Sequence, residues 1–364
     1  MDIQKEIADL SVRIFQKAAE MPGNALVSPI AAIAALSAIL CGASGRTKAQ
    51  LEEEWGITPD GLAPILEAFQ DERSCAELAT VIWMNNRLDL TFNEDLIQEI
   101  AADPNCEVFQ TADLEQACNR INDWCNQKTK GMIPGMVDQL APNEVMRLVN
   151  ALVFDGKWCY AYQPCNVYDR TFTNIRGEKQ DVPFLHSTES LFLRDRHATG
   201  FMKPYLGGQY AFAALLPNEG ISLEDYIRTL TGRKLQRILR HPLSHEVLTA
   251  IPKFSARSDV HLKSIFQDLG ITDAFDMAKA DFTNLCHSDD PDTFFYLESF
   301  RQKGYIEVNE RGTQALVLTG IDTLCLTSAA KPEPYRVYLD RPFLYMIVDQ
   351  KSHLPLFMGT VEVI

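Results

Sequence analysis

The fold of this chain is decided by one stretch, which reads Gly304-Tyr-Ile-Glu-Val-Asn-Glu-Arg-Gly-Thr-Gln-Ala-Leu-Val-Leu-Thr319. Its first part, Tyr305–Asn309, alternates β-forming and polar residues, which predicts a strand. After Gly312 the chain stays strand-forming, where a loop would normally be polar and rich in turn residues. Small or β-branched residues occupy alternate positions there, namely Thr313, Ala315, Val317 and Thr319. One face of this segment could therefore slide between two existing strands, although periodicity alone favours a permanent edge strand.

The stretch also carries a family resemblance. Glu307–Ala315 resembles the hinge of the reactive-centre loop in serpins. Val337–Ile347, with Pro342-Phe343 at its centre, is similar to the serpin C-terminal signature, and Leu148–Trp158 is similar to the family's Asn-Ala-x-x-Phe-x-Gly-x-Trp segment. By these motifs, their order and their spacing, the chain is identified as a member of the serpin family. The lack of an Asn-x-Ser/Thr sequon is compatible with a prokaryotic member.

The fold class follows from the order of the patterns. Helical patterns dominate the first half of the chain and short strands the second half, which predicts an α+β protein. The resemblance implies the serpin fold, with mixed helices, a large central β-sheet, two further sheets and an exposed reactive-centre loop at approximately 310–334. No linker or charge block divides the 364 residues, so a single domain over 1–364 is expected.

Local signals place several elements. Ser28-Pro29 predicts an N-cap and a first-turn proline for an apolar helix that follows. Thr47–Gln50 could form a capping box for a second helix, and Phe294–Ser299 has the composition of a strand. Asn150 lies in an otherwise apolar strand, where a buried amide needs hydrogen-bond partners.

Composition limits the partners. The chain has 34 Lys+Arg and 49 Asp+Glu, a formal net charge of −15 at pH 7. This acidity argues against nucleic acid, heparin-like polyanions and anionic membranes as partners. The longest apolar run, Ile30–Cys41, is too short to span a bilayer. A monomer without a cofactor is expected.

The cysteines and the first residues bear on the compartment. Nine cysteines are an odd number, and no spacing matches a zinc or redox motif. Family habit favours an extracellular, secreted protein whose signal is absent from this numbering. The alternative is a cytoplasmic protein, which the cysteines and the lack of a signal sequence near Met1 favour. Cys325 lies within the expected loop, where redox sensitivity is a hypothesis and tolerated variation the simpler interpretation.

No segment predicts catalysis. His241-Pro-Leu-Ser-His245 has the histidine spacing of a metalloprotease helix, but it lacks the glutamate and contains a helix-breaking proline. The acidic segment 287–292 is typical of a solvated turn rather than a calcium loop. The chain is therefore predicted to be no enzyme and to bind no metal.

The resemblance implies a protease inhibitor that acts as a suicide substrate. Counting from Glu310 as in inhibitory serpins places the reactive bond between Leu326 and Thr327. A target serine protease would cleave there, form a covalent acyl-enzyme complex, and be trapped as the loop inserts into the main sheet. Leu326 suits an apolar specificity pocket of chymotrypsin, elastase or subtilisin type. Alternatives are a non-inhibitory carrier or chaperone, and cross-class inhibition of papain-like cysteine proteases.

The resemblance also assigns site residues. The hinge residues are Glu310, Gly312, Thr313, Ala315 and Val317. The shutter and breach residues, which control opening of the main sheet, are Ser28 and Asn150 in the shutter and Trp158 in the breach. The chain departs from the family pattern at a few positions, which puts the rate of sheet opening in doubt: Ala31, Gln302, Arg311, Leu316 and Leu318.

Overall fold

The structure is a computed structural model that describes residues 3–56, 75–86, 90–103, 105–133, 135–142, 144–288, 294–312 and 333–364. Within this part the chain divides into two compact units, each of which is described by itself. The first unit comprises Met1–Ala18, Val27–Phe154 and Arg257–Tyr305, and the second comprises Ala19–Leu26, Asp155–Ala256 and Ile306–Ile364. The chain passes from one unit to the other several times, so each unit consists of three separate segments.

The first unit begins with helices. Helix α1 (Ile3–Ala19) buries one apolar stripe, and α2 (Pro29–Leu40) is buried nearly all round. Ser28 caps α2 as predicted, since its hydroxyl accepts a bond from the Ala31 amide at 3.3 Å. The capping box predicted for α3 (Gly45–Trp55) is wrong, because that helix begins earlier, with Ser44 at its N-cap. The Thr47 hydroxyl instead accepts a bond from the Asp281 amide at 3.0 Å.

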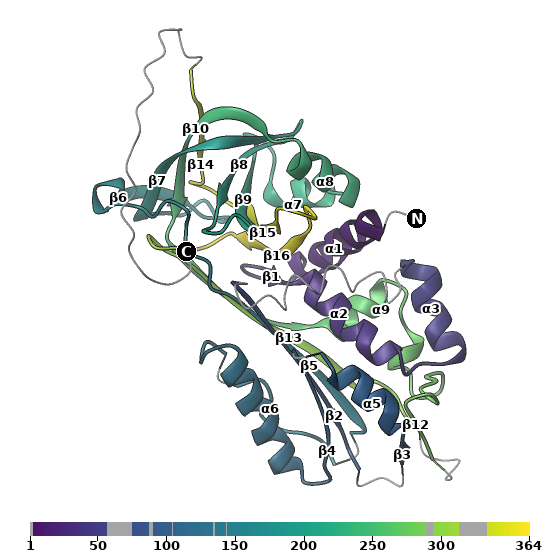
Figure 1. Ribbon diagram of the computed structural model, residues 1–364. Coiled ribbons are helices and arrows are strands. Elements are labelled where there is room, and N and C mark those ends of the chain that lie inside the picture. Colours follow the sequence, from purple (N-terminus) through teal and green to yellow (C-terminus); the bar gives the residue numbers. More distant parts are fainter. Residues whose placement is uncertain are drawn as a thin grey trace. The chain divides into compact units, whose positions relative to one another are not determined.

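A five-stranded sheet forms the centre of the first unit, in the order β11-β13-β5-β2-β4 (Figure 1). Its strands are β2 (Ala76–Met84), β4 (Cys106–Gln110), β5 (Met146–Phe154), β11 (Phe254–His261) and β13 (Ser299–Val308). Strand β13 pairs in parallel with β5, from Ser299 opposite Arg147 to Tyr305 opposite Val153. The strand predicted at Phe294–Ser299 is wrong, since β13 begins only at Ser299. Phe295 is instead packed edge-on against Phe92 and Phe282.

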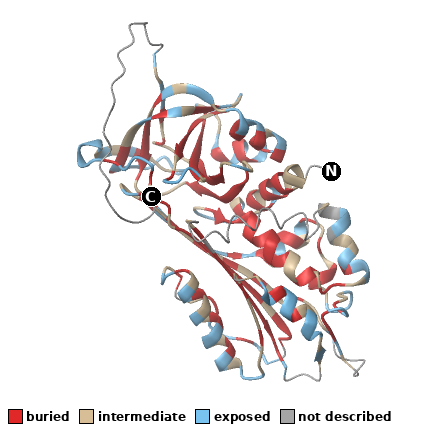
Figure 2. Cartoon of the chain, viewed as in Figure 1, coloured by how far each residue is buried: buried red, intermediate tan, exposed pale blue. Residues whose placement is uncertain are grey.

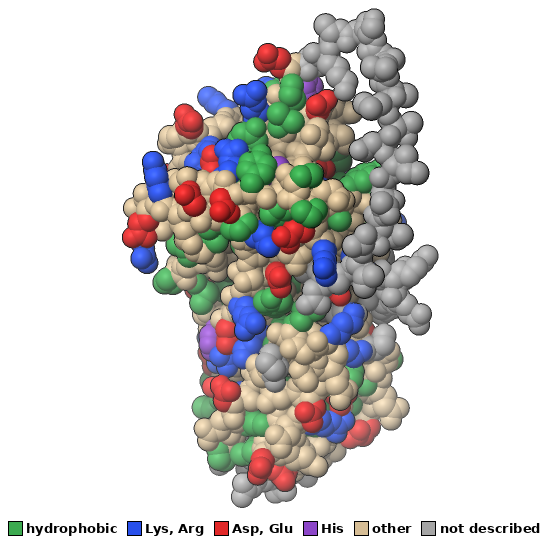
Figure 3. Space-filling view, turned by 90° about the vertical axis from the view of Figure 1, so that its left-hand side faces the viewer, with side chains coloured by type: hydrophobic (Ala, Val, Ile, Leu, Met, Phe, Trp, Pro, Cys, Tyr) green, Lys and Arg blue, Asp and Glu red, His purple; other side chains and the backbone are tan. Residues whose placement is uncertain are grey.

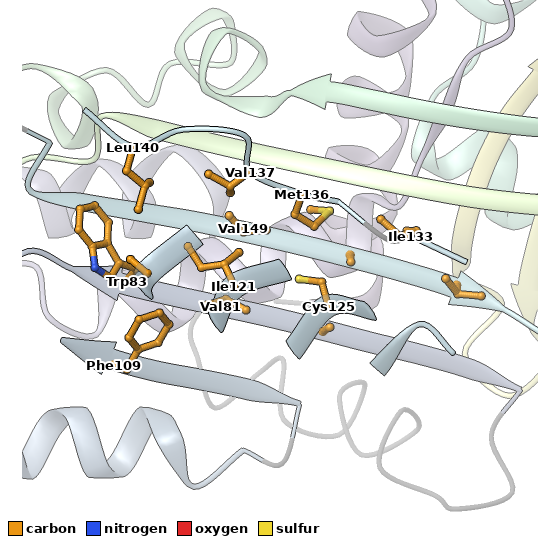
Figure 4. Packing of buried hydrophobic residues seen from close by; sticks show 14 residues of the cluster. Val81, Trp83, Phe109, Ile121, Cys125, Ile133, Met136, Val137, Leu140 and Val149 are labelled. Atoms are coloured by element: carbon orange, nitrogen blue, oxygen red, sulfur yellow. The ribbon is translucent and has the colours of Figure 1, made fainter. Parts of the chain in front are cut away.

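One face of this sheet is covered by α6 (Leu114–Lys128) and the segment after it. Ile121 and Cys125 of α6 pack with Val81 and Trp83 of β2 in one buried cluster. Figure 4 shows that the segment beyond α6 adds further side chains over Val149 of β5: Ile133, Met136, Val137 and Leu140. Smaller elements complete the unit: α5 (Glu94–Ala101), α9 (Leu262–Asp268), a 3-10 turn at Asp273–Phe275, and strands β3 (Thr91–Phe92) and β12 (Cys286–His287).

The second unit is built on a nine-stranded sheet, in the order β1-β16-β15-β9-β8-β7-β10-β14, with β6 paired to β7. Its strands are β1 (Leu26–Val27), β6 (Val167–Thr173), β7 (Lys179–Arg194), β8 (Ala198–Pro204), β9 (Tyr210–Pro217), β10 (Leu243–Pro252), β14 (Tyr335–Tyr338), β15 (Phe343–Asp349) and β16 (Pro355–Val361). A 3-10 turn at Pro164–Asn166 and helices α7 (Leu223–Arg228) and α8 (Gly232–Arg240) join them. Strands β9, β15 and β16 are buried throughout, as the red colour in Figure 2 shows.

The surface carries mixed charges. On the face shown in Figure 3, acidic and basic side chains are interspersed. No helix in the described ranges is long and apolar enough to cross a membrane.

Candidate functional site

The predicted hinge begins with a tight turn at the end of β13, Asn309–Gly312, which we call the hinge turn. The Gly312 amide donates to the Asn309 carbonyl at 3.4 Å, and the Asn309 amide donates to the Gly312 carbonyl at 3.2 Å. The Arg311 amide donates to Oδ1 of Asn309 at 3.0 Å. Asn309 therefore shapes the turn with both its backbone and its side chain, a role that asparagine commonly takes.

Gly312 is the residue of this turn that admits no side chain. Its φ is +119°, a backbone conformation that residues with a Cβ rarely adopt. A Cβ at this position would lie 2.3 Å from the Gly156 carbonyl oxygen and 2.6 Å from Cα of Lys157. Both contacts are with backbone, which cannot rotate away as a side chain would. The hinge glycine therefore allows the turn to lie directly on the segment before Trp158.

Backbone carbonyls of the hinge turn are held by the Trp158 segment. The Trp158 amide donates to the Arg311 carbonyl at 3.2 Å, and its indole Nε1 donates to the Asn309 carbonyl at 2.9 Å. The Tyr162 amide donates to the Glu310 carbonyl at 2.9 Å. The structure thus brings together three of the residues assigned to the hinge and the breach: Glu310, Gly312 and Trp158.

An ion pair adds to this attachment. Nζ of Lys253 donates to Oε1 of Glu310 at 2.7 Å, and both side chains are about one-third exposed. Partial burial would by itself raise the pKa of Glu310. The bond from Lys253, a backbone amide bond and the charges of Lys253 and Arg311 outweigh burial, so the pKa lies below its ordinary value.

Trp158 rests on a buried aromatic and ionic layer that sequence reasoning missed. Its ring stacks on Tyr205, with 4.5 Å between centroids and 9° between planes. Nζ of Lys203 lies 4.5 Å from the Tyr162 ring centroid and 5.5 Å from that of Trp158. Lys203 also pairs with Oε1 of Glu189 at 2.7 Å, and these side chains are only 3% and 8% exposed. Burial, followed by the charge of Glu189, raises the pKa of Tyr162 far above its usual range, so the phenol stays neutral.

A signal for this layer was present in the sequence. Lys203 interrupts the apolar segment 201–204, and a lysine in such a strand needs a buried partner. That the partner is Glu189 could not be read from the sequence, because β7 and β8 are paired only through tertiary structure.

The predicted shutter residues meet in the first unit, in a cluster of neutral side chains. Gln302 accepts a bond from the Ser28 amide at 2.8 Å and donates to the Ser28 carbonyl at 3.0 Å. It also donates to Oδ1 of Asn150 at 2.9 Å, and Asn150 donates to the Thr80 hydroxyl at 3.1 Å. Ser28, Asn150 and Gln302 are at most 1% exposed. The expectation that Asn150 needs buried partners is confirmed.

We call Ser28, Thr80, Asn150 and Gln302 the seam cluster, because it joins α2 to the parallel seam between β13 and β5. Gln302 lies opposite Asn150 in the register of that seam. Gln302, one of the positions that depart from the family pattern, is thus the centre of the cluster. None of the four side chains ionises in the physiological pH range, so the cluster is held together without charge.

Other assigned residues lie outside the described part of the chain. These are the remaining hinge residues and the reactive bond: Thr313, Ala315, Val317, Leu326 and Thr327. Cys325 lies outside it as well. The assigned roles of all site residues stay predictions.

The structure also shows where the histidines and cysteines considered for metal or thiol chemistry lie. Over the described ranges, no group of three or more His, Cys, Asp or Glu is placed to hold a metal ion. His241 directly follows α8, whereas His245 lies within strand β10, so the two are not on one helix. No disulfide bond joins the cysteines of the described ranges. Burial raises the pKa of Cys286 to about 12.

Comparisons with known proteins agree on one family. The family described as "Serpin (serine protease inhibitor)" matches residues 5–363. Serpin B6 of Pongo abelii is 27% identical over 357 residues, which cover 92% of this chain and 92% of the relative. Glia-derived nexin of Homo sapiens is 29% identical over 364 residues, which cover 93% and 87%. The crystal structure of the thermophilic serpin tengpin in its native state matches with 33% identity and a TM-score of 0.90, over 99% of this chain and 94% of that one.

Proposed function

Because the chain belongs to the serpin family, we propose that it inhibits a serine protease by acting as a suicide substrate. The observation that carries the proposal is the parallel seam between β13 and β5. Strand β13 leads straight into the hinge turn, and the sequence after that turn is strand-forming. A strand-forming segment therefore follows directly on one strand of the seam.

The direction of the chain explains why the seam is a suitable place for insertion. A segment that folds back after the hinge turn runs antiparallel to β13, and hence antiparallel to β5 as well. Its insertion would replace one parallel pairing by two antiparallel ones, which are slightly more stable per residue. Each added backbone hydrogen bond contributes a net stabilisation of about 0.5–1.5 kcal/mol. Loop insertion of this kind is established for serpins, and we take it from the family.

The chemistry belongs to the target protease. Its serine oxygen attacks the carbonyl carbon of Leu326, the bond to Thr327 breaks, and the amino group of Thr327 leaves with a proton. The product is an ester between the protease and Leu326, which insertion of the loop would carry away from the hinge turn. An apolar residue at this position favours proteases of chymotrypsin, elastase or subtilisin type. The inhibitor acts as a monomer in this scheme.

The test is incubation of the full chain with chymotrypsin, neutrophil elastase and trypsin. We expect an SDS-stable complex with the first two, and a released peptide that begins at Thr327 by mass spectrometry. Cleavage without a complex, across a panel that includes papain-like proteases, would reject inhibition and favour a carrier or chaperone. A complex with papain alone would favour cross-class inhibition.

A matched pair of variants tests the hinge. Thr313→Arg places a long cation where the inserting face must enter the sheet, so we expect cleavage without trapping. Thr313→Ala keeps a small side chain and should still form the complex. If both variants trap the protease as well as the natural chain does, the hinge assignment is wrong.

A further inference from the structure

The ion pair between Lys203 of β8 and Glu189 of β7 is buried, and stability alone does not account for it. Nζ of Lys203 lies 2.7 Å from Oε1 of Glu189, and the two side chains are 3% and 8% exposed. The cost of removing two charges from water is of the same order as their mutual attraction, so apolar side chains of similar volume would stabilise such a site about as well. A fully bonded buried pair does, however, fix the positions of its neighbours.

The lysine of this pair lies against two aromatic rings. Nζ of Lys203 is 4.5 Å from the ring centroid of Tyr162 and 5.5 Å from that of Trp158. The attraction between a cation and an aromatic face is strongest where water is excluded. Because Glu189 holds the ammonium group in one place, both rings are attracted to a fixed point.

The glutamate reaches Tyr162 by a second route. Oε1 of Glu189 accepts a bond from the Ser187 hydroxyl at 2.6 Å, and the oxygen of that hydroxyl lies 3.3 Å from the Tyr162 hydroxyl. It also lies 2.9 Å from the Thr249 hydroxyl of β10. The pair is thus anchored by side chains of three adjacent strands, β8, β7 and β10.

Both rings belong to residues that hold the hinge turn. Trp158 donates to the carbonyls of Asn309 and Arg311, and the Tyr162 amide donates to the carbonyl of Glu310. Hydrogen bonds weaken steeply as they leave a linear geometry. A tilt of the indole would therefore weaken its bond to Asn309 directly, and a shift of either ring would displace the backbone that carries the amide donors.

We propose that Lys203 and Glu189 are positioning residues that set how firmly the hinge turn is held. This inference rests on the proposed function and deepens it, because such an inhibitor needs a hinge turn that stays closed until insertion begins. The hold on the turn is a property of the chain alone, so it can be measured without a protease.

The test is hydrogen exchange of the full chain, measured by mass spectrometry on the peptide 156–163, which contains the amide donors of Trp158 and Tyr162. Lys203→Met combined with Glu189→Gln removes both charges and keeps the size of both side chains. We expect exchange in this peptide to become at least about tenfold faster, the size of a cation–π contact in a water-excluded site. Exchange in β9 should change little, because the double variant contains no unpaired buried charge.

A matched control removes another ion pair of the second unit, between Lys234 of α8 and Asp195. Nζ of Lys234 lies 2.8 Å from Oδ2 of Asp195 and 4.8 Å from the ring centroid of Tyr226, so this pair combines the same two kinds of contact. Lys234→Met combined with Asp195→Asn should leave exchange in the peptide 156–163 unchanged. Equal acceleration in both double variants would indicate general loosening and overturn the proposal, as would unchanged exchange in the variant of Lys203 and Glu189.

A milder variant decides the matter if the double variant does not fold. Ser187→Ala breaks the link from Glu189 to the Tyr162 hydroxyl and keeps the ion pair. Exchange in the peptide 156–163 should become roughly twofold to fivefold faster, the size of one hydrogen bond, and unchanged exchange would overturn the proposal. The proposed function fails separately: if the natural chain forms no SDS-stable complex with any protease, inhibition is rejected, while the exchange rates still decide the role of the pair.

Discussion

The hinge turn and the seam cluster are held in different ways. At the hinge turn, donors from Trp158 and Tyr162 bind backbone carbonyls, and a glycine lies on neighbouring backbone. In the seam cluster, the amide side chains of Asn150 and Gln302 make most of the bonds. Backbone carbonyls are present in every residue, so Glu310 and Arg311 should tolerate substitution, whereas Asn309 and Gly312 should not. The bonds of the seam cluster depend on particular amide side chains, so the cluster should not tolerate substitution.

The largest effect is expected at Gly312. Gly312→Ala adds a Cβ that overlaps neighbouring backbone and requires a positive φ, so we expect a loss of at least about 2 kcal/mol in stability. Gly177→Ala is the control, since its φ is +79° but nothing lies within 4 Å of the added Cβ. Thermal unfolding measures both. Equal losses in the two variants would mean that the contact with the Trp158 segment contributes nothing.

The seam cluster should respond next. Asn150→Ala removes the acceptor of Gln302 and the donor to Thr80, leaving buried polar groups unpaired at a cost of about 1–3 kcal/mol. Thr80→Val removes one acceptor only and keeps the side-chain shape, so its cost should be smaller. Urea unfolding of both variants gives the order, and a larger loss for Thr80→Val would contradict the central place of Asn150.

The hinge turn carries an ion pair, whereas the seam cluster is neutral, and a titratable residue placed in the cluster tests this difference. Gln302→His places an imidazole in the seam cluster, where burial lowers its pKa below the unfolded value of about 6.5. Its stability contribution would be fully present above about pH 6.5 and lost as the pH falls through that value, because the unfolded chain then binds the extra proton. The melting temperature of the variant should fall relative to the natural chain between pH 8 and pH 5.5. Parallel curves would refute burial of this position.

The smallest effect is expected for Lys253→Ala. The Lys253–Glu310 pair is partly exposed, and such pairs contribute at most about 1 kcal/mol. Because the pKa of Glu310 is lowered in the fold, this contribution is present above its ordinary pKa and lost as the pH falls through the lowered value. The difference between variant and natural chain should therefore vanish in acid and shrink in high salt. A difference that grows in acid would contradict the pairing.

Much of the architecture could be predicted from the sequence. The serpin fold, predicted from short motifs, is confirmed. The capped start of α2, predicted from Ser28-Pro29, is confirmed as well. Gly312 was assigned to the hinge and Trp158 to the breach, and the structure places the two in contact through the hinge turn. The prediction of a strand at Phe294–Ser299 was wrong. This aromatic segment has the composition of a strand, but Phe295 packs against other rings and β13 begins only at Ser299.

The sequence by itself determined the family, the helical and strand-forming segments and the residues that needed special partners, because periodicity, capping and steric limits act over a few neighbouring residues. Only the tertiary structure decided which partners they found: Gln302 for Asn150, Glu189 for Lys203, and the Trp158 segment for Gly312. These pairings depend on which strands lie side by side and in what register. Register is set by the packing of whole sheet faces, so it is not encoded in any one segment.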